Sequence, residues 1–376
     1  MPETNHEFVA SYKFQTNRSK VAVVKILFLI SGDRVPSSRF RVLPYVPYLR
    51  SLGHKCTVAS SFPQKYDYFP WIGFRPSQLL KRLVRMWHLL KARLGRYDVI
   101  FIDREIFDDD TISMEARFRK VTSTLILDVD DAVFLRHPQK FERLARMSDL
   151  VIAGNRFLKE RIEPINPNIV VVPTCIDMLN YPQKEEDATA DSRTVIGWIG
   201  TTGNLQYLQV VAPALRKLAT CCEFELRLIA PENTPLKSID LTGVDVHFVR
   251  WQGATEVDEL LKIDVGLMPL FPDDEWNVYK CGLKLLQYMA IGIPGVASPI
   301  GVNTEIVQHG ENGFLASEPD EWAEVLLQLV RNPGLRQSIG KQARRTVEQR
   351  YSIQTHLPRL INSLQAAIRR DPTDDI

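Results

Sequence analysis

The sequence predicts an α/β protein built from two doubly wound domains, each with a parallel sheet covered by helices. Three observations indicate this fold. Short apolar runs recur along the chain, helical patterns separate them, and a polar, acidic segment divides the series into two halves. Strands of parallel sheets are buried on both faces, so they appear as continuous apolar runs. A length of 376 residues also suits two or three domains of about 150 residues each.

The first series of strands defines an N-terminal domain, expected over residues 21–180. Residues 1–20 form a polar tail without the apolar core of a secretory signal. Six runs then have the length and composition of buried strands. They are Val21–Ile30, Cys56–Ala59, Asp98–Ile102, Leu125–Val129, Leu150–Ala153 and Ile169–Val172.

A polar segment without periodicity, residues 181–193, is expected to be a linker. The alternation of strands and helices then restarts and predicts a second domain over residues 194–350. Its expected strands are Thr194–Ile199, Phe224–Ile229, Val244–Val249, Val265–Met268 and Gly295–Ala297, with helices near 205–218 and at Leu283–Ile291. Apolar residues at helical spacing predict a last helix over 351–370. Ligands of open α/β sheets bind at the carboxyl ends of the strands, so we expect substrate in a cleft between the domains.

The composition excludes several classes of protein. Lys and Arg total 47 against 45 Asp and Glu, so the net charge of +2 gives no global reason to expect nucleic-acid binding. The five cysteines include no C-x-x-C and the seven histidines no H-E-x-x-H, so no disulfide framework, metal site or cofactor is expected. The longest apolar run, Val21–Ile30, contains Lys25 and is far shorter than the roughly 20 residues of a membrane span. These features predict a cytoplasmic enzyme.

Common catalytic motifs are also absent from the sequence. It contains neither the G-x-x-x-x-G-K-[ST] of a P-loop nor the G-x-S-x-G of an α/β-hydrolase. The glycine-rich segment Gly197–Gly203 follows an expected strand but does not match G-x-G-x-x-G. A dinucleotide site is therefore weakly supported.

Chemistry-bearing residues concentrate in the segment 264–315. Lys280, Lys284 and Gln287 are spaced i, i+4 and i+7, which predicts one shared face of a helix that starts near Gly282. Two ammonium groups near a helix N-terminus favour an anion such as a diphosphate, and Gln287 could then bond a sugar or ribose hydroxyl. The plain alternative is a solvated pair of lysines on an amphipathic surface.

A second turn strengthens the prediction of a phosphate site. Ser298–Gly301 precedes another short helix, for which Asn303 or Thr304 is a plausible N-cap. Two helix N-termini directed at one place would bind a phosphate group well.

These residues resemble the donor-binding half of nucleotide-sugar glycosyltransferases with the GT-B fold, in the retaining family four. The most specific segments are Asp264–Leu267, Gln287–Pro294 and Gly310–Leu315, while Ser37–Val42 and Leu49–Val58 look like the start of the family's N-terminal domain. The resemblance implies two Rossmann-like domains and a terminal helix that crosses back to the first. It also implies transfer from a UDP- or GDP-linked sugar to an acceptor hydroxyl, with retention and without bound metal.

This chain departs from the family at two glutamates, whose positions are occupied by Tyr279 and Gln287. A basic residue of the second domain's first loop is also missing from Thr201–Gln206, and Lys280 and Lys284 could supply that charge. A non-catalytic sugar-nucleotide or glycan-binding protein therefore stays open. The resemblance gives the following donor-binding candidates: Gly200, Thr201, Lys280, Lys284, Gln287, Asn303, Thr304 and Glu305.

A second cluster of polar residues, Asp128-Val-Asp130-Asp131, ends the expected strand Leu125–Val129. Carboxylates at a strand's carboxyl end can hold a metal, orient an acceptor hydroxyl or take its proton. We expect Asp130 and Asp131 to be catalytic together with Lys284. The alternatives are a helix cap with an ion pair to Arg136, or a metal-dependent GT-A-like site that uses Asp128-x-Asp130.

Two further segments carry hypotheses about phosphate and membrane binding. Arg39 and Arg41, with Gly32, follow the first strand and are expected on the phosphate or acceptor side, unless they pair with Asp33 on the surface. Residues 75–96 hold seven Lys or Arg, no acid, and several apolar residues at helical spacing. Such a helix either docks on an anionic membrane or packs on the sheet with a basic outer face. Docking at the inner face of the membrane would suit a lipid-linked acceptor. A glycan or small-molecule acceptor would not require membrane docking.

Overall fold

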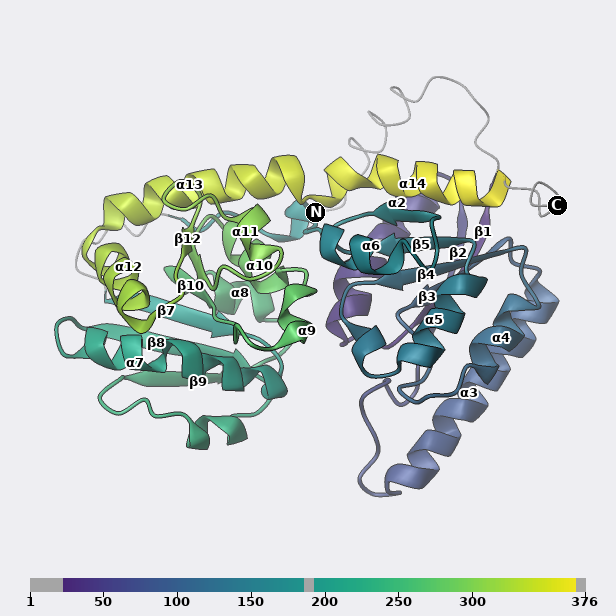
Figure 1. Cartoon of the computed structure of the whole chain (residues 1–376), viewed down its shortest axis with the longest axis horizontal. Helices are drawn as coiled ribbons and strands as arrows, with labels where there is room; N and C mark the ends of the chain where they lie inside the picture. Colours follow the sequence, from purple (N-terminus) through teal and green to yellow (C-terminus); the bar gives the residue numbers. More distant parts are fainter. Residues whose placement is uncertain (1–22, 186–192, 370–376) are drawn as a thin grey trace. The chain divides into compact units, whose positions relative to one another are not determined.

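The computed structural model describes residues 23–185 and 193–369. They fall into two compact units (Figure 1). Unit 1 runs up to Thr174 and includes the chain from His356 onward, and unit 2 is Cys175–Thr355. The expected tail at 1–20 lies outside the described residues, as does most of the expected linker.

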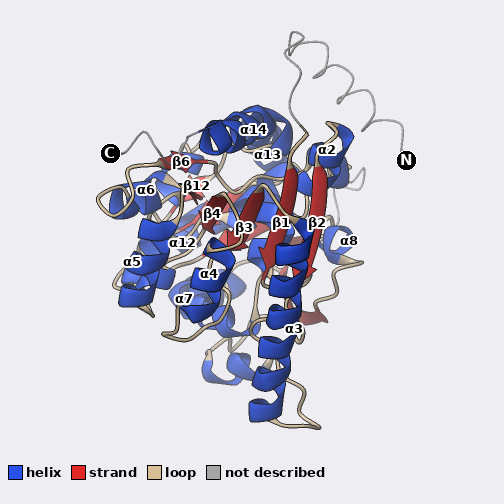
Figure 2. Cartoon of the chain, turned by 90° about the vertical axis from the view of Figure 1, so that its right-hand side faces the viewer, coloured by secondary structure: helices blue, strands red, loops and turns tan. Residues whose placement is uncertain are grey.

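Unit 1 contains a six-stranded, fully parallel sheet in the order β2-β1-β3-β4-β5-β6. The strands are β1 (Lys25–Ile30), β2 (Lys55–Ser60), β3 (Val99–Asp103), β4 (Thr124–Val129), β5 (Leu150–Ala153) and β6 (Ile169–Val171). Every residue of β3, β4 and β5 is buried, as expected for strands covered on both faces. Figure 2 shows these strands with helices around them.

The helices of unit 1 connect successive strands of its sheet. They are the π-helical turn η1 (Ser38–Val42), α2 (Tyr45–Ser51), α3 (Phe74–Gly95), α4 (Ser113–Arg119), η2 (Val133–Leu135), α5 (Pro138–Met147) and α6 (Arg156–Ile162). The terminal helix α14 (Ile353–Arg369) groups with unit 1 from His356 onward.

Unit 2 contains a second parallel sheet in the order β12-β11-β10-β7-β8-β9. Its strands are β7 (Thr194–Ile199), β8 (Phe224–Ala230), β9 (Val246–Arg250), β10 (Val265–Met268), β11 (Gly295–Ala297) and β12 (Phe314–Leu315). Its helices are η3 (Met178–Asn180), η4 (Thr202–Tyr207), α7 (Leu208–Ala219), η5 (Thr234–Ser238), α8 (Glu256–Leu260), α9 (Glu275–Val278), α10 (Leu283–Ala290), α11 (Asn303–Ile306), α12 (Pro319–Arg331) and α13 (Pro333–Arg350). The predicted class, two doubly wound α/β domains, is confirmed.

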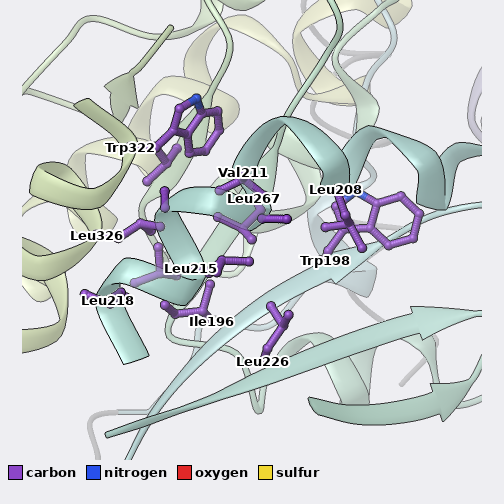
Figure 3. Close-up of a cluster of buried hydrophobic side chains, with 14 of the residues drawn as sticks. Ile196, Trp198, Leu208, Val211, Leu215, Leu218, Leu226, Leu267, Trp322 and Leu326 are labelled. Atoms are coloured by element: carbon purple, nitrogen blue, oxygen red, sulfur yellow. The ribbon is translucent and has the colours of Figure 1, made fainter. Parts of the chain in front are cut away.

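One core of unit 2 lies between its sheet and helices α7 and α12 (Figure 3). Trp198 of β7 and Trp322 of α12 are the largest fully buried side chains of the described chain. Leu208, Val211 and Leu215 recur at helical spacing on α7 and face the same core. This packing fixes β7, and with it the loop that follows β7.

The first residues of the expected linker pack against unit 2. Tyr181 is 5% exposed, and its backbone oxygen accepts a hydrogen bond from Arg344. The Nζ of Lys184 lies 2.7 Å from an oxygen of Asp264. The structure therefore divides the chain after Thr174 rather than at residue 181. Tyr181 and Lys184 thus form a hydrogen bond and an ion pair within unit 2, and composition alone does not reveal such partners.

Helix α3 turns polar residues toward unit 1. The guanidinium of Arg85 donates to the backbone oxygens of Ala59 and Ile30 at 2.8 and 2.7 Å. His88, one turn later, is half-buried beside it. Burial, together with the charges of Arg85 and Lys91, lowers the pKa of His88 to about 4. His88 is therefore neutral in the folded protein at pH 7.

We expect His88 to make the folded state less stable in mild acid. The unfolded chain has the ordinary histidine pKa of about 6.5, so it binds more protons than the folded chain between pH 6.5 and about 4. Above that range His88 does not lower the free energy of unfolding. As the pH drops through the range, this free energy falls by about 1 kcal/mol, with solvent screening allowed for. Urea unfolding at pH 7 and pH 5 should show this loss in the wild type and a smaller one in His88→Gln. An equal loss in both would contradict the assignment.

Candidate active site

Each sheet has a point at which successive connections leave to opposite sides. In unit 2 this switch point lies between β7 and β10, and in unit 1 between β1 and β3. Ligands of open α/β sheets bind beyond the carboxyl ends of the strands at such a point. The loops after these four strands are therefore the candidate ligand-binding loops of the two units.

Lys284 and Gly200 meet at the switch point of unit 2. Gly200 follows β7, and Lys284 lies in the first turn of α10, after β10. The Nζ of Lys284 lies 5.4 Å from the centre of the Trp198 ring. A Cβ on Gly200 would lie only 2.8 Å from Cε of Lys284, so a larger residue would displace the lysine. The fold thus places one ammonium group where the sequence predicted an anion site.

Lys280 lies near the same loop but, contrary to the prediction, outside helix α10. Gly282 has a left-handed conformation with φ of 66°, and α10 begins only at Leu283. Lys280 therefore precedes the helix and does not share a helical face with Lys284, which corrects the i, i+4, i+7 interpretation. Its Nζ lies 5.4 Å from the centre of the Tyr207 ring, in η4. Both lysines are directed at rings that flank the loop containing Gly200 and the exposed Thr201.

The turn before α11 lies beside the start of α10. Gly301 has φ of 53° and is pressed against the backbone of Val278, where any side chain would overlap. A Cβ on Gly282 would lie 3.6 Å from the side-chain oxygen of Asn303. The segment that carries Lys280 and the turn Ser298–Gly301 are therefore neighbours. Their predicted joint binding of a phosphate stays a prediction.

The predicted capping of α11 is wrong. Its N-cap is Val302, and among the described residues no side chain caps this helix. Asn303 is buried and donates its amide to the backbone oxygen of Ser298 at 3.0 Å. The exposed Thr304 donates to the backbone oxygen of Gly301 at 2.8 Å, and Glu305 is half-buried. The helix starts one or two residues earlier than expected, so both side chains bond back to the turn.

Gln287 points into unit 2, which corrects its expected hydrogen bond to a sugar or ribose hydroxyl. Gln287 is only 3% exposed. Its amide nitrogen donates to the hydroxyl of Tyr181 and to a carboxylate oxygen of Glu256, each at 3.0 Å. Glu256 in turn accepts a hydrogen bond from the indole of Trp251 at 2.6 Å. Both amide hydrogens of Gln287 are therefore used inside the unit.

In unit 1, Asp130 and Asp131 follow β4 and lie beside Arg104, which follows β3. The Nε of Arg104 bonds Asp130, and its other nitrogen lies 3.6 Å from Asp131. Burial opposes ionisation of Asp130, but the charge and hydrogen bond of Arg104 hold its pKa below the ordinary carboxyl value. Asp130 is therefore a carboxylate at neutral pH. Arg136, the partner considered for one of these aspartates, makes an ion pair with Asp108 at 3.4 Å.

Arg104 is a site residue that the sequence reasoning missed. It has φ of 63°, a conformation that is costly for a residue other than glycine. Its backbone N–H donates to the backbone oxygen of Asp128 at 2.9 Å, which ties the end of β3 to the end of β4. The signal available in the sequence was the charged triplet Asp103-Arg104-Glu105 at the end of a buried strand.

Arg41 and Asp128 form a buried ion pair, which corrects two expectations. The Nε of Arg41 donates to Asp128 at 3.0 Å, and a second nitrogen donates to the backbone oxygen of Val172 at 2.6 Å. The two side chains are 3% and 1% exposed. Burial raises the pKa of Asp128 to about 6, although Arg41 opposes this rise. Arg41 therefore does not reach a substrate, and Asp128 is closed to a metal ion.

The Asp128-x-Asp130 pair thus has both carboxylates bound by arginines of unit 1. This arrangement does not fit the metal-binding pair of the GT-A-like alternative. Arg39, the other arginine of the Ser37–Val42 segment, is half-buried with its guanidinium 5.1 Å from the centre of the Phe40 ring. Its predicted part in binding phosphate or acceptor stays a prediction.

A pocket of about 510 Å³ lies at the carboxyl ends of β1 and β2. Gly32 stands at its edge, where a Cβ would overlap the side chain of Gln64. Asp33 accepts a hydrogen bond from Gln64, and Arg34 pairs with Asp67 at 2.7 Å across the same loops. The lining residues are Asp33, Arg34, Ser60, Ser61, Phe62, Pro63, Gln64, Tyr66, Asp67, Tyr68 and Phe69. The mixture of aromatic and polar residues after β2 was the missed sequence signal.

Part of the chain matches a known protein family. Residues 193–332 match the family described as glycosyl transferases group 1. The chain is also 28% identical over 218 residues to the N-acetyl-alpha-D-glucosaminyl L-malate synthase of Bacillus anthracis. That match spans 54% of this chain and 56% of the relative, so the chain covers about half the length of that curated protein.

Solved structures of glycosyltransferases share the fold over nearly the whole chain. A glycosyltransferase from Rickettsia africae is similar with a TM-score of 0.68 and 14% identity, covering 93% of this chain and 100% of that one. The sucrose-phosphate synthase of Thermosynechococcus elongatus gives 0.66 and 13%, with 92% and 100% covered. Anabaena HepE in complex with UDP and glucose gives 0.61 and 16%, with 91% and 100% covered. Residues 193–332 therefore resemble the glycosyl transferases group 1 family, and the chain as a whole has the GT-B fold of these structures.

Proposed function

We propose that this chain transfers a sugar from a nucleotide-sugar donor to an acceptor hydroxyl, with retention of configuration and without a bound metal. The observation that carries the proposal is Lys284 over Gly200 at the switch point of the group 1 domain. An ammonium group held there suits the diphosphate of a donor. The matched family and the shared fold support a reaction of this class.

The lysines would act on the charge that develops as the bond between sugar and phosphate breaks. The acceptor oxygen forms the new bond to the sugar, the acceptor proton passes to solvent water, and the nucleoside diphosphate departs with added negative charge. Lys284 and Lys280 would neutralise that charge without reorganising, which is often the largest catalytic term. In unit 1, Asp130 and Asp131 would orient the acceptor hydroxyl, while Arg104 fixes the carboxylates.

We propose a UDP- or GDP-linked sugar as donor, with UDP the first to test. HepE is described in complex with UDP and glucose, and the Bacillus relative is named for an N-acetylglucosaminyl product. A glycan, a lipid-linked sugar or a small hydroxy compound is the proposed class of acceptor. The pocket after β1 and β2 would take part of it, because its aromatic and hydrogen-bonding residues suit a sugar ring. A cytoplasmic location fits such a donor.

Thermal unfolding of the full chain with UDP, GDP, ADP or NAD, each with and without Mn²⁺, tests the proposal. A ligand that binds only the folded state stabilises it by about 2.7 kcal/mol at 100 times its Kd. We expect one nucleoside diphosphate to raise the melting temperature equally with and without Mn²⁺. A rise that requires Mn²⁺ would contradict the metal-independent reading.

A turnover assay separates catalysis from binding. Release of nucleoside diphosphate from its sugar conjugate should depend on an added acceptor, and NMR of the product should show the donor's anomeric configuration. The replacement of the two family glutamates by Tyr279 and Gln287, with Gln287 buried, keeps a non-catalytic binding protein as the second candidate. Nucleotide binding without turnover across a panel of acceptors would favour that candidate.

A further inference from the structure

Helix α3 buries polar side chains and exposes apolar ones, the reverse of an ordinary surface helix. Its buried positions include Ser77, Lys81 and Arg85, with Leu89 and Ala92 further along the same face. Lys81 donates to the backbone oxygen of Lys65 at 2.7 Å, and Arg85 uses two nitrogens on backbone oxygens of β1 and β2. Polar side chains thus attach this helix to unit 1, whereas apolar side chains usually do so.

The apolar residues of α3 lie on its opposite face, exposed to solvent. We call Leu79, Leu83, Met86, Trp87, Leu90 and Leu94 the outer stripe; they are 60%, 58%, 42%, 56%, 45% and 77% exposed. Counted from Leu79 they fall at i, i+4, i+7, i+8, i+11 and i+15, so they follow one side of the helix along four turns. A continuous exposed apolar face of this kind marks an interaction surface, because monomeric proteins rarely expose one.

Basic side chains border the outer stripe on both edges. Arg75, Arg82 and Arg93 share one edge by helical spacing, and Lys91 lies on the other. Residues 74–96 contain no acidic residue. Arg82 makes an ion pair with Asp109 at 2.9 Å, yet its side chain stays 48% exposed. The apolar face is therefore flanked by cations whose long stems can reach past it.

Aromatic residues continue the apolar surface at the start of α3. The loop before the helix exposes Trp71 at 81% and Tyr68 at 49%, and Phe74, the first helical residue, is 61% exposed. In Figure 2, α3 lies on the outer side of unit 1, and its first turns and this loop extend beyond the strands of the sheet. Trp and Tyr are the residues enriched where a protein meets the headgroups of a bilayer.

We propose that the outer stripe of α3 docks unit 1 on the surface of an anionic lipid bilayer. The apolar side chains and Trp71 would enter the boundary between headgroups and acyl chains, while the flanking arginines and Lys91 bind lipid phosphates. Among the described residues no helix is long and apolar enough to cross a membrane, so α3 would lie in the plane of the surface. The borders of positive charge favour this occupant over an apolar groove of a protein partner.

Sedimentation of the full chain with vesicles tests the proposal independently of any enzyme activity. We expect the chain to sediment with vesicles of equal parts phosphatidylcholine and phosphatidylglycerol, and at least tenfold less with phosphatidylcholine alone. The double variant Leu83→Glu, Leu90→Glu should lose this binding by at least tenfold. Both leucines are exposed, so the variant should keep the wild-type circular dichroism and melting temperature.

Two matched variants control for nonspecific effects. Leu179→Glu changes a leucine of unit 2 that is 45% exposed, and it should bind vesicles as the wild type does. Arg75→Ser with Arg93→Ser should reduce binding to anionic vesicles, whereas Arg143→Ser, on the exposed side of α5, should not. Wild-type vesicle binding by the Leu83, Leu90 variant would overturn the proposal. So would a wild-type dimer that binds no vesicles and becomes monomeric in that variant, because the outer stripe would then contact a second copy.

Discussion

Replacing Lys284 by Met is expected to lower kcat/KM for the donor by about 100-fold or more, the usual cost of removing one preorganised charge from a transition state. Met keeps most of the unbranched stem that lies over Gly200 and beside Trp198, so the packing of the loop after β7 should persist. Only the ammonium group is lost. Steady-state kinetics with the nucleotide sugar, together with calorimetric titration of the nucleoside diphosphate, would measure both consequences.

Lys217→Met is the matched control for this prediction. Lys217 also lies in unit 2, at the end of α7, but its side chain is 64% exposed and paired with Asp320 at 2.7 Å on the surface. Its removal should leave turnover and nucleotide affinity unchanged. Lys284→Arg should restore part of the nucleotide affinity, because the charge returns with a different shape. Wild-type affinity of Lys284→Met for the nucleoside diphosphate would contradict the placement of the donor site.

The sequence was sufficient to predict the strands and the fold class because their signals are local. Strands β7, β10 and β11 begin and end at the predicted residues. Parallel strands are buried on both faces, so each one leaves a continuous apolar run that does not depend on its neighbours. The expected class of each domain follows from the order of such runs and helices alone.

The partners of polar side chains could not be predicted, because they depend on contacts that are remote in sequence. Arg41 and Asp128 are 87 residues apart, and only the assembled sheet brings them together. Gln287 and Tyr181 are separated by 106 residues, across a segment whose polarity suggested a linker. A local feature caused the error at Lys280, since the left-handed Gly282 delays the start of α10. Helical spacing therefore identified Lys284 but not its neighbours.

Replacing Asp130 by Asn is expected to lower kcat by about 100-fold, within the range for a group that orients or accepts a proton in the transition state. The amide keeps the size of the carboxylate and an oxygen that can accept from Arg104, so the positions of β3 and β4 should change little. Affinity for the nucleoside diphosphate should be unchanged, because Asp130 belongs to unit 1 and the proposed donor site to unit 2. This separation distinguishes the variant from Lys284→Met.

The pH profile of kcat distinguishes a role in the reaction from a role in the ion pair alone. Arg104 lowers the pKa of Asp130, so in the wild type protonation of this carboxylate should not limit kcat at pH values above the ordinary carboxyl pKa of 3.8. Asp130→Asn should be slow at every pH. Asp131 is more exposed and lies 3.6 Å from Arg104, so Asp131→Asn should lower kcat less.

Removing one partner of a buried pair costs about 3–5 kcal/mol when the remaining charge has no other partner. Because Asp131 still faces Arg104, Asp130→Asn should lose less stability than this. An Asp130→Asn variant with normal kcat and a lowered melting temperature would mean that the carboxylate serves only to hold Arg104.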